Sequence, residues 1–229
     1  MTPPRLALIG HGKMGRAVEQ LAREQGHSVV VILGAGDAIS RETLRDAQVA
    51  IEFTTPGAAP ANIRACLAAG CPVVSGTTGW YDEMDAMRAE VARHDGALLC
   101  AANFSVGVHI MLRLAALAGS LVAAAGLDAQ IIETHHAAKR DAPSGTATLL
   151  ASATGDALGR VVPVTSVRTG SVPGTHELIF DGAWEQLRIE HVARDRRVFA
   201  DGALVASRWI VGKRGVFTMR DVLGAENGE

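Results

Sequence analysis

Short apolar runs alternate with amphipathic segments over the first hundred residues of the chain. The apolar runs predict buried strands at 5–10, 28–33, 49–54, 72–75 and 97–101. After most of these runs, apolar side chains recur at helical spacing, which predicts helices at 13–25, 59–69 and 82–94. Strands that alternate with helices are typical of a doubly wound parallel sheet with helices on both faces, so an α/β domain of the Rossmann type is expected.

The pattern changes after about residue 102. A long apolar helix is expected at 106–125, then a strand at 129–135 and a helix at 144–158. Three strands at 162–168, 176–180 and 186–192 then follow one another through glycine-containing turns, which indicates a mixed or antiparallel sheet. A last helix at 202–211 is expected to return to the first domain. We therefore predict one domain at 1–103 plus about 201–229, and an α+β domain at 104–200.

The composition limits the class of protein. Hydrophobic residues make up 48% of the 229 residues, yet no run of about eighteen apolar residues occurs, so no membrane span is expected. The net charge of −2 gives no basic footprint for nucleic acid or for an anionic membrane. The first residues lead into a strand without a signal peptide, and the three cysteines match no zinc spacing. A cytoplasmic protein with buried thiols is expected.

A glycine-rich segment, Gly10-His11-Gly12-Lys13-Met14-Gly15, closes the first expected strand and opens the first helix. In a dinucleotide-binding fold the first glycine permits a tight turn, the second lets the backbone approach a pyrophosphate, and the third allows close helix–strand packing. The helix N-terminus adds free N–H groups and a positive dipole end. The motif in this context predicts a bound nicotinamide cofactor, and a merely tight strand–helix turn is the alternative.

One part of the expected dinucleotide site is missing. An acidic residue that binds the ribose hydroxyls is expected at the end of the second strand, about twenty residues after the glycines. Gly34 stands at that place, Asp37 comes late, and no arginine for a 2′-phosphate is obvious. Lys13 is either a phosphate contact or a solvated lysine. The choice between NADH and NADPH is open from the sequence, and weak discrimination is expected.

Two further loops follow strands at the edge of the sheet where a doubly wound fold binds its ligand. Threonine hydroxyls, an asparagine and loop amides there can bond the ribose or the nicotinamide carboxamide. Ordinary turn chemistry and helix capping account for the same residues equally well. The residues are Gly76, Thr77 and Thr78 in one loop, and Ala101, Ala102, Asn103 and Phe104 in the other.

The densest chemistry follows the expected strand at 129–135. Lys139 can donate a proton if neighbours and desolvation depress its pKa, and His135 or His136 can orient or bind a carboxylate. The turn Ser144-Gly145-Thr146 opens a helix, so its amides and hydroxyls form an anion cradle. This set suits a small dicarboxylate substrate. A metal site formed by Glu133, His135 and His136 is disfavoured, because the two adjacent histidines on a strand point to opposite faces. A structural loop with hydrogen-bonded histidines is the other alternative.

Motifs along nearly the whole chain resemble those of the 4-hydroxy-tetrahydrodipicolinate reductase family, formerly called dihydrodipicolinate reductases. In chain order they are Glu52-Phe53-Thr54-x-Pro56, Gly76-Thr77-Thr78-Gly79, Ala101-Ala102-Asn103-Phe104-Ser105-Val106-Gly107-Val108, Glu133-x-His135-His136-x-x-Lys139-x-Asp141-Ala142-Pro143-Ser144-Gly145-Thr146-Ala147, Arg168-x-Gly170, Gly174-x-His176 and Phe199-Ala200-x-Gly202-Ala203. The resemblance implies a Rossmann domain, a mixed-sheet domain for substrate binding and tetramerisation, and a homotetramer. It implies hydride transfer from NADH or NADPH to a cyclic imine-like intermediate of lysine (diaminopimelate) biosynthesis.

The resemblance also implies roles for single residues. His135 is implied as the catalytic acid/base and Lys139 as the proton donor; no metal is expected, on the strand geometry given above. Substrate contacts are implied for His136, Gly145 and Thr146, and cofactor contacts for Gly10 to Met14, Gly76 to Thr78 and Ala101 to Phe104. Two features depart from the family pattern: the glycine loop is one residue short with Gly34 in place of an acid, and the segment from Thr146 to Arg168 is shorter. A different Rossmann dehydrogenase for an amino acid or sugar, and a dinucleotide sensor without turnover, are the competing functions.

Overall fold

The computed structural model describes residues 3–224. The chain folds into two compact units. Unit 1 comprises Met1–Ser105 and Arg197–Glu229, and unit 2 comprises Val106–Arg196. The sequence analysis predicted domain boundaries at 103/104 and at about 200/201. Residues 225–229, at the end of the range predicted to return to the first domain, lie outside the described residues. Among the described residues, no helix combines the length and the apolar character that crossing a bilayer requires.

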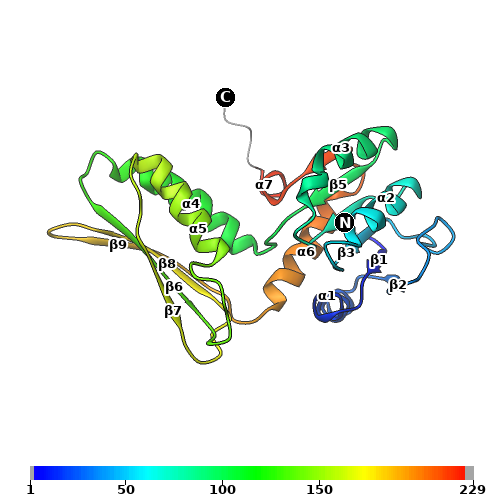
Figure 1. The fold of residues 1–229 in the computed structure, drawn as a ribbon, viewed down its shortest axis with the longest axis horizontal. Helices are drawn as coiled ribbons and strands as arrows, with labels where there is room; N and C mark the ends of the chain where they lie inside the picture. The colour runs from blue at the N-terminus through cyan, green and yellow to red at the C-terminus, as the bar shows by residue number, and fades with distance from the viewer. Residues whose placement is uncertain (1–2, 225–229) are drawn as a thin grey trace. The chain divides into compact units, whose positions relative to one another are not determined.

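Unit 1 is built on a six-stranded sheet in the order β10-β5-β4-β3-β1-β2, in which every neighbouring pair is parallel (Figure 1). Its strands are Leu6–Ile9 (β1), Val29–Leu33 (β2), Val49–Glu52 (β3), Val73–Ser75 (β4), Ala97–Cys100 (β5) and Gly215–Phe217 (β10). Its helices are Lys13–Glu24 (α1), Ala59–Ala68 (α2), the 3₁₀ turn Tyr81–Glu83 (η1), Met84–Arg93 (α3), Arg197–Ile210 (α6) and Met219–Val222 (α7). The predicted parallel Rossmann-type sheet is confirmed.

Helices cover both faces of this sheet. Helix α6 packs against α1 and the central strands, whereas α2 and α3 pack against each other and against β4 and β10. Strands buried on both faces need apolar side chains throughout, and this is why β1 reads Leu-Ala-Leu-Ile without a polar alternation.

The three cysteines are free and buried, as expected. Burial raises the pKa of the Cys71 and Cys100 thiols to about 12.

Unit 2 pairs two helices with a mixed four-stranded sheet in the order β7-β6-β8-β9. Strands β6 and β7 are parallel, while β8 is antiparallel to both β6 and β9, so the predicted mixed sheet is confirmed. Figure 1 shows α4 and α5 side by side on one face of the sheet. The elements are Val106–Val122 (α4), Asp128–His135 (β6), Gly145–Leu158 (α5), Val164–Arg168 (β7), Thr175–Asp181 (β8) and Gln186–Val192 (β9).

Strand β6 carries the candidate catalytic residues to the covered face of the sheet. Alternate residues along it are buried, from Ala129 and Ile131 to Glu133 and His135. Ala129 and Ile131 belong to the apolar core beneath α4 and α5. Because side chains alternate along a strand, Glu133 and His135 point to the same face as that core. The strand therefore ends with a carboxylate and an imidazole held at the edge of an apolar interior.

Candidate active site

The glycine-rich loop of unit 1 has the geometry of a phosphate-binding turn. Gly10 has φ +93°, and a Cβ there would lie 2.2 Å from the carbonyl oxygen of Phe53. A Cβ on Gly15 would lie 2.1 Å from the carbonyl oxygen of Gly10, so only glycine allows α1 to approach the loop this closely. Gly12 is the N-cap of α1 and makes no side-chain cap. The first amides of α1 are thus available for an anion.

A buried carboxylate joins the loops that follow β3 and β4. Glu52 is fully buried, and its Oε2 accepts a hydrogen bond from Ser75 Oγ at 2.6 Å. Its Oε1 accepts from Thr77 Oγ1 at 2.9 Å and from the Thr54 hydroxyl. The Thr54 amide donates back to Thr77 Oγ1 at 2.8 Å. Thr77, one of the predicted cofactor contacts, is therefore fixed from below by Glu52, which the sequence did not single out as a site residue.

The other predicted cofactor residues lie at or near the carboxyl ends of the same strands but differ in exposure. Thr78 and Ala102 are exposed, and the Asn103 carboxamide oxygen accepts from the Ser105 amide at 2.8 Å. Phe104 is 2% exposed, with its ring against that of Phe53 at 5.8 Å between centroids. A cofactor contact by Phe104 would therefore use its backbone. In the glycine loop itself, His11 and Lys13 are exposed, Met14 is half-buried, and His11 Nε2 lies 2.7 Å from Glu19 Oε2.

The turn after β2 brings the Asp37 carboxylate beside Gly34. The Gly34 amide donates to Asp37 Oδ2 at 2.7 Å, because the segment turns back through Gly36, which has φ +90°. The Gly10 amide in turn donates to the Leu33 carbonyl oxygen at 2.8 Å. Leu33, the last residue of β2, is therefore bonded to the glycine loop, and the Asp37 carboxylate is bonded to the next residue, Gly34.

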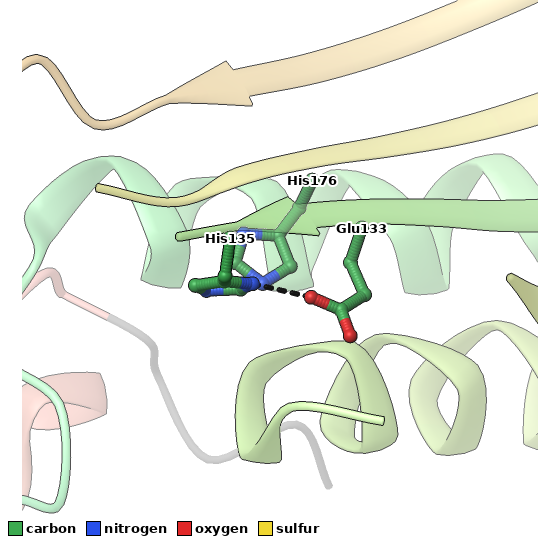
Figure 2. Close-up of side chains that lie close together, drawn as sticks. All are labelled: Glu133, His135 and His176. Atoms are coloured by element: carbon green, nitrogen blue, oxygen red, sulfur yellow. Dashed lines mark hydrogen bonds and ion pairs between the residues drawn. The ribbon is translucent and has the colours of Figure 1, made fainter. Parts of the chain in front are cut away.

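In unit 2, Glu133 is the centre of a network of charged groups. Arg168 Nη2 donates to its Oε1 at 2.6 Å, and the Ser144 amide donates to the same oxygen at 3.3 Å. Its Oε2 accepts from His135 Nδ1, as Figure 2 shows. Burial would raise the pKa of Glu133, but the Arg168 guanidinium, the Ser166 hydroxyl and the His135 ring together outweigh it and lower the pKa to about 2. The ionised carboxylate only accepts, so the Nδ1 of His135 carries the proton and Nε2, which lies beside Gly174, has none.

His176 completes this cluster from the neighbouring strand. It pairs with Glu133 in the β6–β8 register, and its ring meets that of His135 edge-on at 5.1 Å (Figure 2). Its Nε2 lies 3.0 Å from Ser144 Oγ, which also accepts from the Ala147 amide as the N-cap of α5. Burial lowers the pKa of His176 to about 4, so the ring is neutral at neutral pH. The Ser144 hydroxyl is already engaged inside the protein, unlike the open anion ligand that the sequence suggested.

The same three side chains, Glu133, His135 and His176, bring potential metal-ligating atoms within 4.8 Å of one another. Both carboxylate oxygens of Glu133 already accept hydrogen bonds, one of them from the Arg168 guanidinium. A cation beside that guanidinium would be repelled, so the arrangement favours a carboxylate–imidazole pair over a metal centre. The absence of a metal stays a prediction.

The loop after β6 presents the remaining predicted residues. Lys139 Nζ donates to both oxygens of Asp141, at 2.7 and 2.8 Å, and this ammonium lowers the pKa of Asp141. Arg168 Nη2 also donates to the Asp141 carbonyl oxygen at 2.6 Å and so anchors the loop. His136 and Thr146 are half-buried and Gly145 is exposed at the start of α5. The structure therefore brings His135, Lys139 and the α5 N-terminus together around one short loop of unit 2.

Comparison with known proteins agrees with these motifs. The family model described as dihydrodipicolinate reductase, N-terminus, matches residues 4–104, and the model for the C-terminus of the same family matches residues 107–223. The chain belongs to the dihydrodipicolinate reductase family. The resemblance inferred from the motifs is thereby confirmed.

Individual relatives of this family match nearly the whole length of the chain. A 4-hydroxy-tetrahydrodipicolinate reductase of Christiangramia forsetii is 36% identical over 233 residues, which cover 95% of this chain and 97% of the relative. One of Acinetobacter baumannii is 34% identical over 96% of each chain. The structure of a dipicolinate-bound dihydrodipicolinate reductase from Paenisporosarcina sp. TG-14 superposes with a TM-score of 0.77 over 94% of this chain and 97% of that one, at 22% identity, and so supports the fold.

Proposed function

We propose that the protein catalyses the reduction of 4-hydroxy-tetrahydrodipicolinate with NADH or NADPH, a step of lysine biosynthesis. The observation that carries the proposal is the full-length match to relatives of that name, at 36% identity over 95% of the chain. The residues in the loop after β6 are consistent with it, because they supply cationic and N–H groups for a small dicarboxylate.

Unit 1 is the proposed cofactor-binding unit. The bound dinucleotide would supply a hydride to an electrophilic ring carbon of the substrate. The amides at the start of α1 would hold the pyrophosphate, and the loops after β4 and β5 would hold the nicotinamide end. Glu52 keeps the Thr77 hydroxyl in place through its bond of 2.9 Å. The residues of unit 1 thus bind and orient the cofactor.

Unit 2 is the proposed substrate-binding and proton-transfer unit. Lys139 is the proposed proton donor, and Asp141, at 2.7 Å, holds its ammonium group in the loop. Glu133 fixes the His135 ring with Nδ1 protonated, which leaves Nε2 without a proton and so able to take one and then return it. The start of α5, where Gly145 is exposed and Thr146 half-buried, would receive a substrate carboxylate at the positive end of the helix dipole, and His136 lies in the loop before it.

A steady-state assay tests the proposal and separates it from its rivals. Consumption of NADH or NADPH is followed by absorbance with freshly generated 4-hydroxy-tetrahydrodipicolinate as substrate, and with amino acids and sugars as alternatives. Turnover with the pathway intermediate is expected. Turnover only with an amino acid or sugar would indicate another dehydrogenase, and dinucleotide binding without turnover on any substrate would indicate a sensor.

We also propose that the chain forms a homotetramer through the uncovered face of the unit 2 sheet. This face, opposite α4 and α5, exposes 38% of Val167 and 54% of Val192. Apolar side chains on a sheet face without covering helices favour association with another copy. Light scattering coupled to size-exclusion chromatography is expected to report a tetramer, and Val192→Glu is expected to shift it toward smaller species. A monomer at all protein concentrations would refute the proposal.

A further inference from the structure

The Asp37 carboxylate lies beside Gly34, the residue that follows β2. A residue at the end of the second strand normally supplies a carboxylate that accepts hydrogen bonds from the ribose hydroxyls. Gly34 stands at this end of β2 and has no side chain to offer. The carboxylate of Asp37 instead lies against it, with Oδ2 2.7 Å from the Gly34 amide nitrogen. A Cβ built on Gly34 would lie 3.7 Å from the same oxygen.

These distances place the Asp37 carboxylate within a few ångströms of the point at which a side chain of residue 34 would begin. An acidic side chain has its carboxylate oxygens a few bonds beyond Cβ, within roughly the same few ångströms. Asp37 therefore supplies from a neighbouring turn the group that the strand end lacks. The second oxygen, Oδ1, forms no hydrogen bond with any residue of 3–224, so it is free to accept one from a ligand.

The turn is fixed directly to the glycine-rich loop. The Gly10 amide donates to the Leu33 carbonyl oxygen at 2.8 Å, and Ile9 pairs with Leu33 in the β1–β2 register. A dinucleotide whose pyrophosphate lies on the amides of α1 would extend its adenosine ribose toward this end of β2.

The charges around Asp37 favour a ribose without a phosphate. Among the described residues no lysine or arginine forms an ion pair with Asp37. The guanidinium that contacts β2, that of Arg45, donates to the Val30 carbonyl oxygen at 3.1 Å, toward the other end of the strand. A 2′-phosphate would add negative charge beside the Asp37 carboxylate and be repelled by it.

On the basis of the proposed function, we propose that Asp37 is the specificity-determining residue of this protein and selects NADH over NADPH. This replaces the weak discrimination expected from Gly34 in the sequence. Hydrogen bonds to a charged group correspond to roughly ten- to hundredfold in affinity. NADH is therefore expected to bind at least about tenfold more tightly than NADPH.

The test measures Kd for NADH and for NADPH by isothermal titration calorimetry, without substrate. Asp37→Asn keeps an oxygen that can accept from the Gly34 amide but removes the charge, so the ratio of the two Kd values is expected to fall toward one. Asp46→Asn is the matched control, because Asp46 is an exposed carboxylate of the same unit whose partner, at 2.6 Å, is Arg5, at the amino end of β1. It is expected to leave the ratio unchanged.

A rescue variant separates recognition from a merely structural role of the turn. In the Asp37→Asn background, Gly34→Glu restores a carboxylate at the strand end and is expected to restore the NADH preference. A wild-type preference for NADPH, an unchanged ratio in Asp37→Asn, or failure of the rescue would each overturn the inference. The proposed function is tested separately: lost turnover with an intact NADH preference would contradict the reductase activity alone, and normal turnover with an unmoved ratio would contradict the role of Asp37 alone.

Discussion

Replacing Glu133 by glutamine is expected to impair both catalysis and stability, for reasons that can be separated. The glutamine carbonyl can still accept from Arg168, but its amide group would face His135 Nδ1 as a donor. The imidazole would then have to place its proton on Nε2 and leave Nδ1 as the acceptor. His135 in this tautomer cannot accept a proton at Nε2, so kcat is expected to fall by about 10²- to 10⁴-fold.

The size of the stability effect follows from the pKa of Glu133. That pKa is about 2, below the ordinary value of 4.5, and the carboxyl is fully buried. Such a difference corresponds to about 3 kcal/mol of folding free energy at neutral pH. Because the folded-state pKa is the lower one, this contribution is present above pH 4.5 and is lost as the pH falls toward 2.

Urea unfolding of wild type and Glu133→Gln across this pH range, together with kcat at neutral pH, checks both effects. The difference in unfolding free energy is expected to shrink as the solution is acidified below about pH 4.5. Asp128→Asn is the matched control, since Asp128 forms an exposed ion pair with Arg160 at the opposite end of the same strand. The control is expected to keep kcat. A kcat in Glu133→Gln within a few-fold of wild type would refute the assigned tautomer, and a pH-independent stability difference would refute the electrostatic reasoning.

Three further substitutions test neighbouring parts of the site. Lys139→Ala is expected to lower turnover by about a hundredfold or more while Kd for the dinucleotide stays near wild type; unchanged turnover would remove Lys139 from the mechanism. His135→Gln is expected to lower turnover far more than Tm, because an amide can still donate to Glu133; a large fall in Tm with turnover retained would make the histidine structural. Gly174→Ala would place a Cβ 3.0 Å from His135 Nε2 and should reduce turnover. Gly126→Ala, at φ +71° in open space, controls for the strain of a positive φ; equal turnover in both variants would contradict a catalytic role for Nε2.

The fold was predictable wherever a local pattern carried it. Alternating apolar runs and helical segments located β1 to β5 of unit 1, and the change of pattern after residue 102 located unit 2. The sequence missed β10, because three residues, Gly215–Phe217, form a strand only by pairing with β5. It also missed α7, a four-residue helix stabilised by a Thr218–Asp221 capping box. Tertiary pairing and side-chain caps decide such short elements.

The site was predictable in its loops but not in its network. His135 and Lys139 stand in one short motif, and the two-residue spacing of Glu133 and His135 already places them on one face of a strand. Arg168 and His176 join them through the register of β7 and β8, which no local pattern specifies. Asp37 reaches the end of β2 only because the chain turns back through Gly36, so its position was equally hidden.

The measurement that tests the central claim most directly is the rate at which the purified protein reduces freshly generated 4-hydroxy-tetrahydrodipicolinate, compared between wild type and Lys139→Ala. The wild type is expected to consume the reduced dinucleotide in step with the substrate, and the variant to bind the dinucleotide equally well but lose about a hundredfold or more in turnover. A wild-type protein that binds the dinucleotide and leaves this substrate unreduced would contradict the proposed reductase activity.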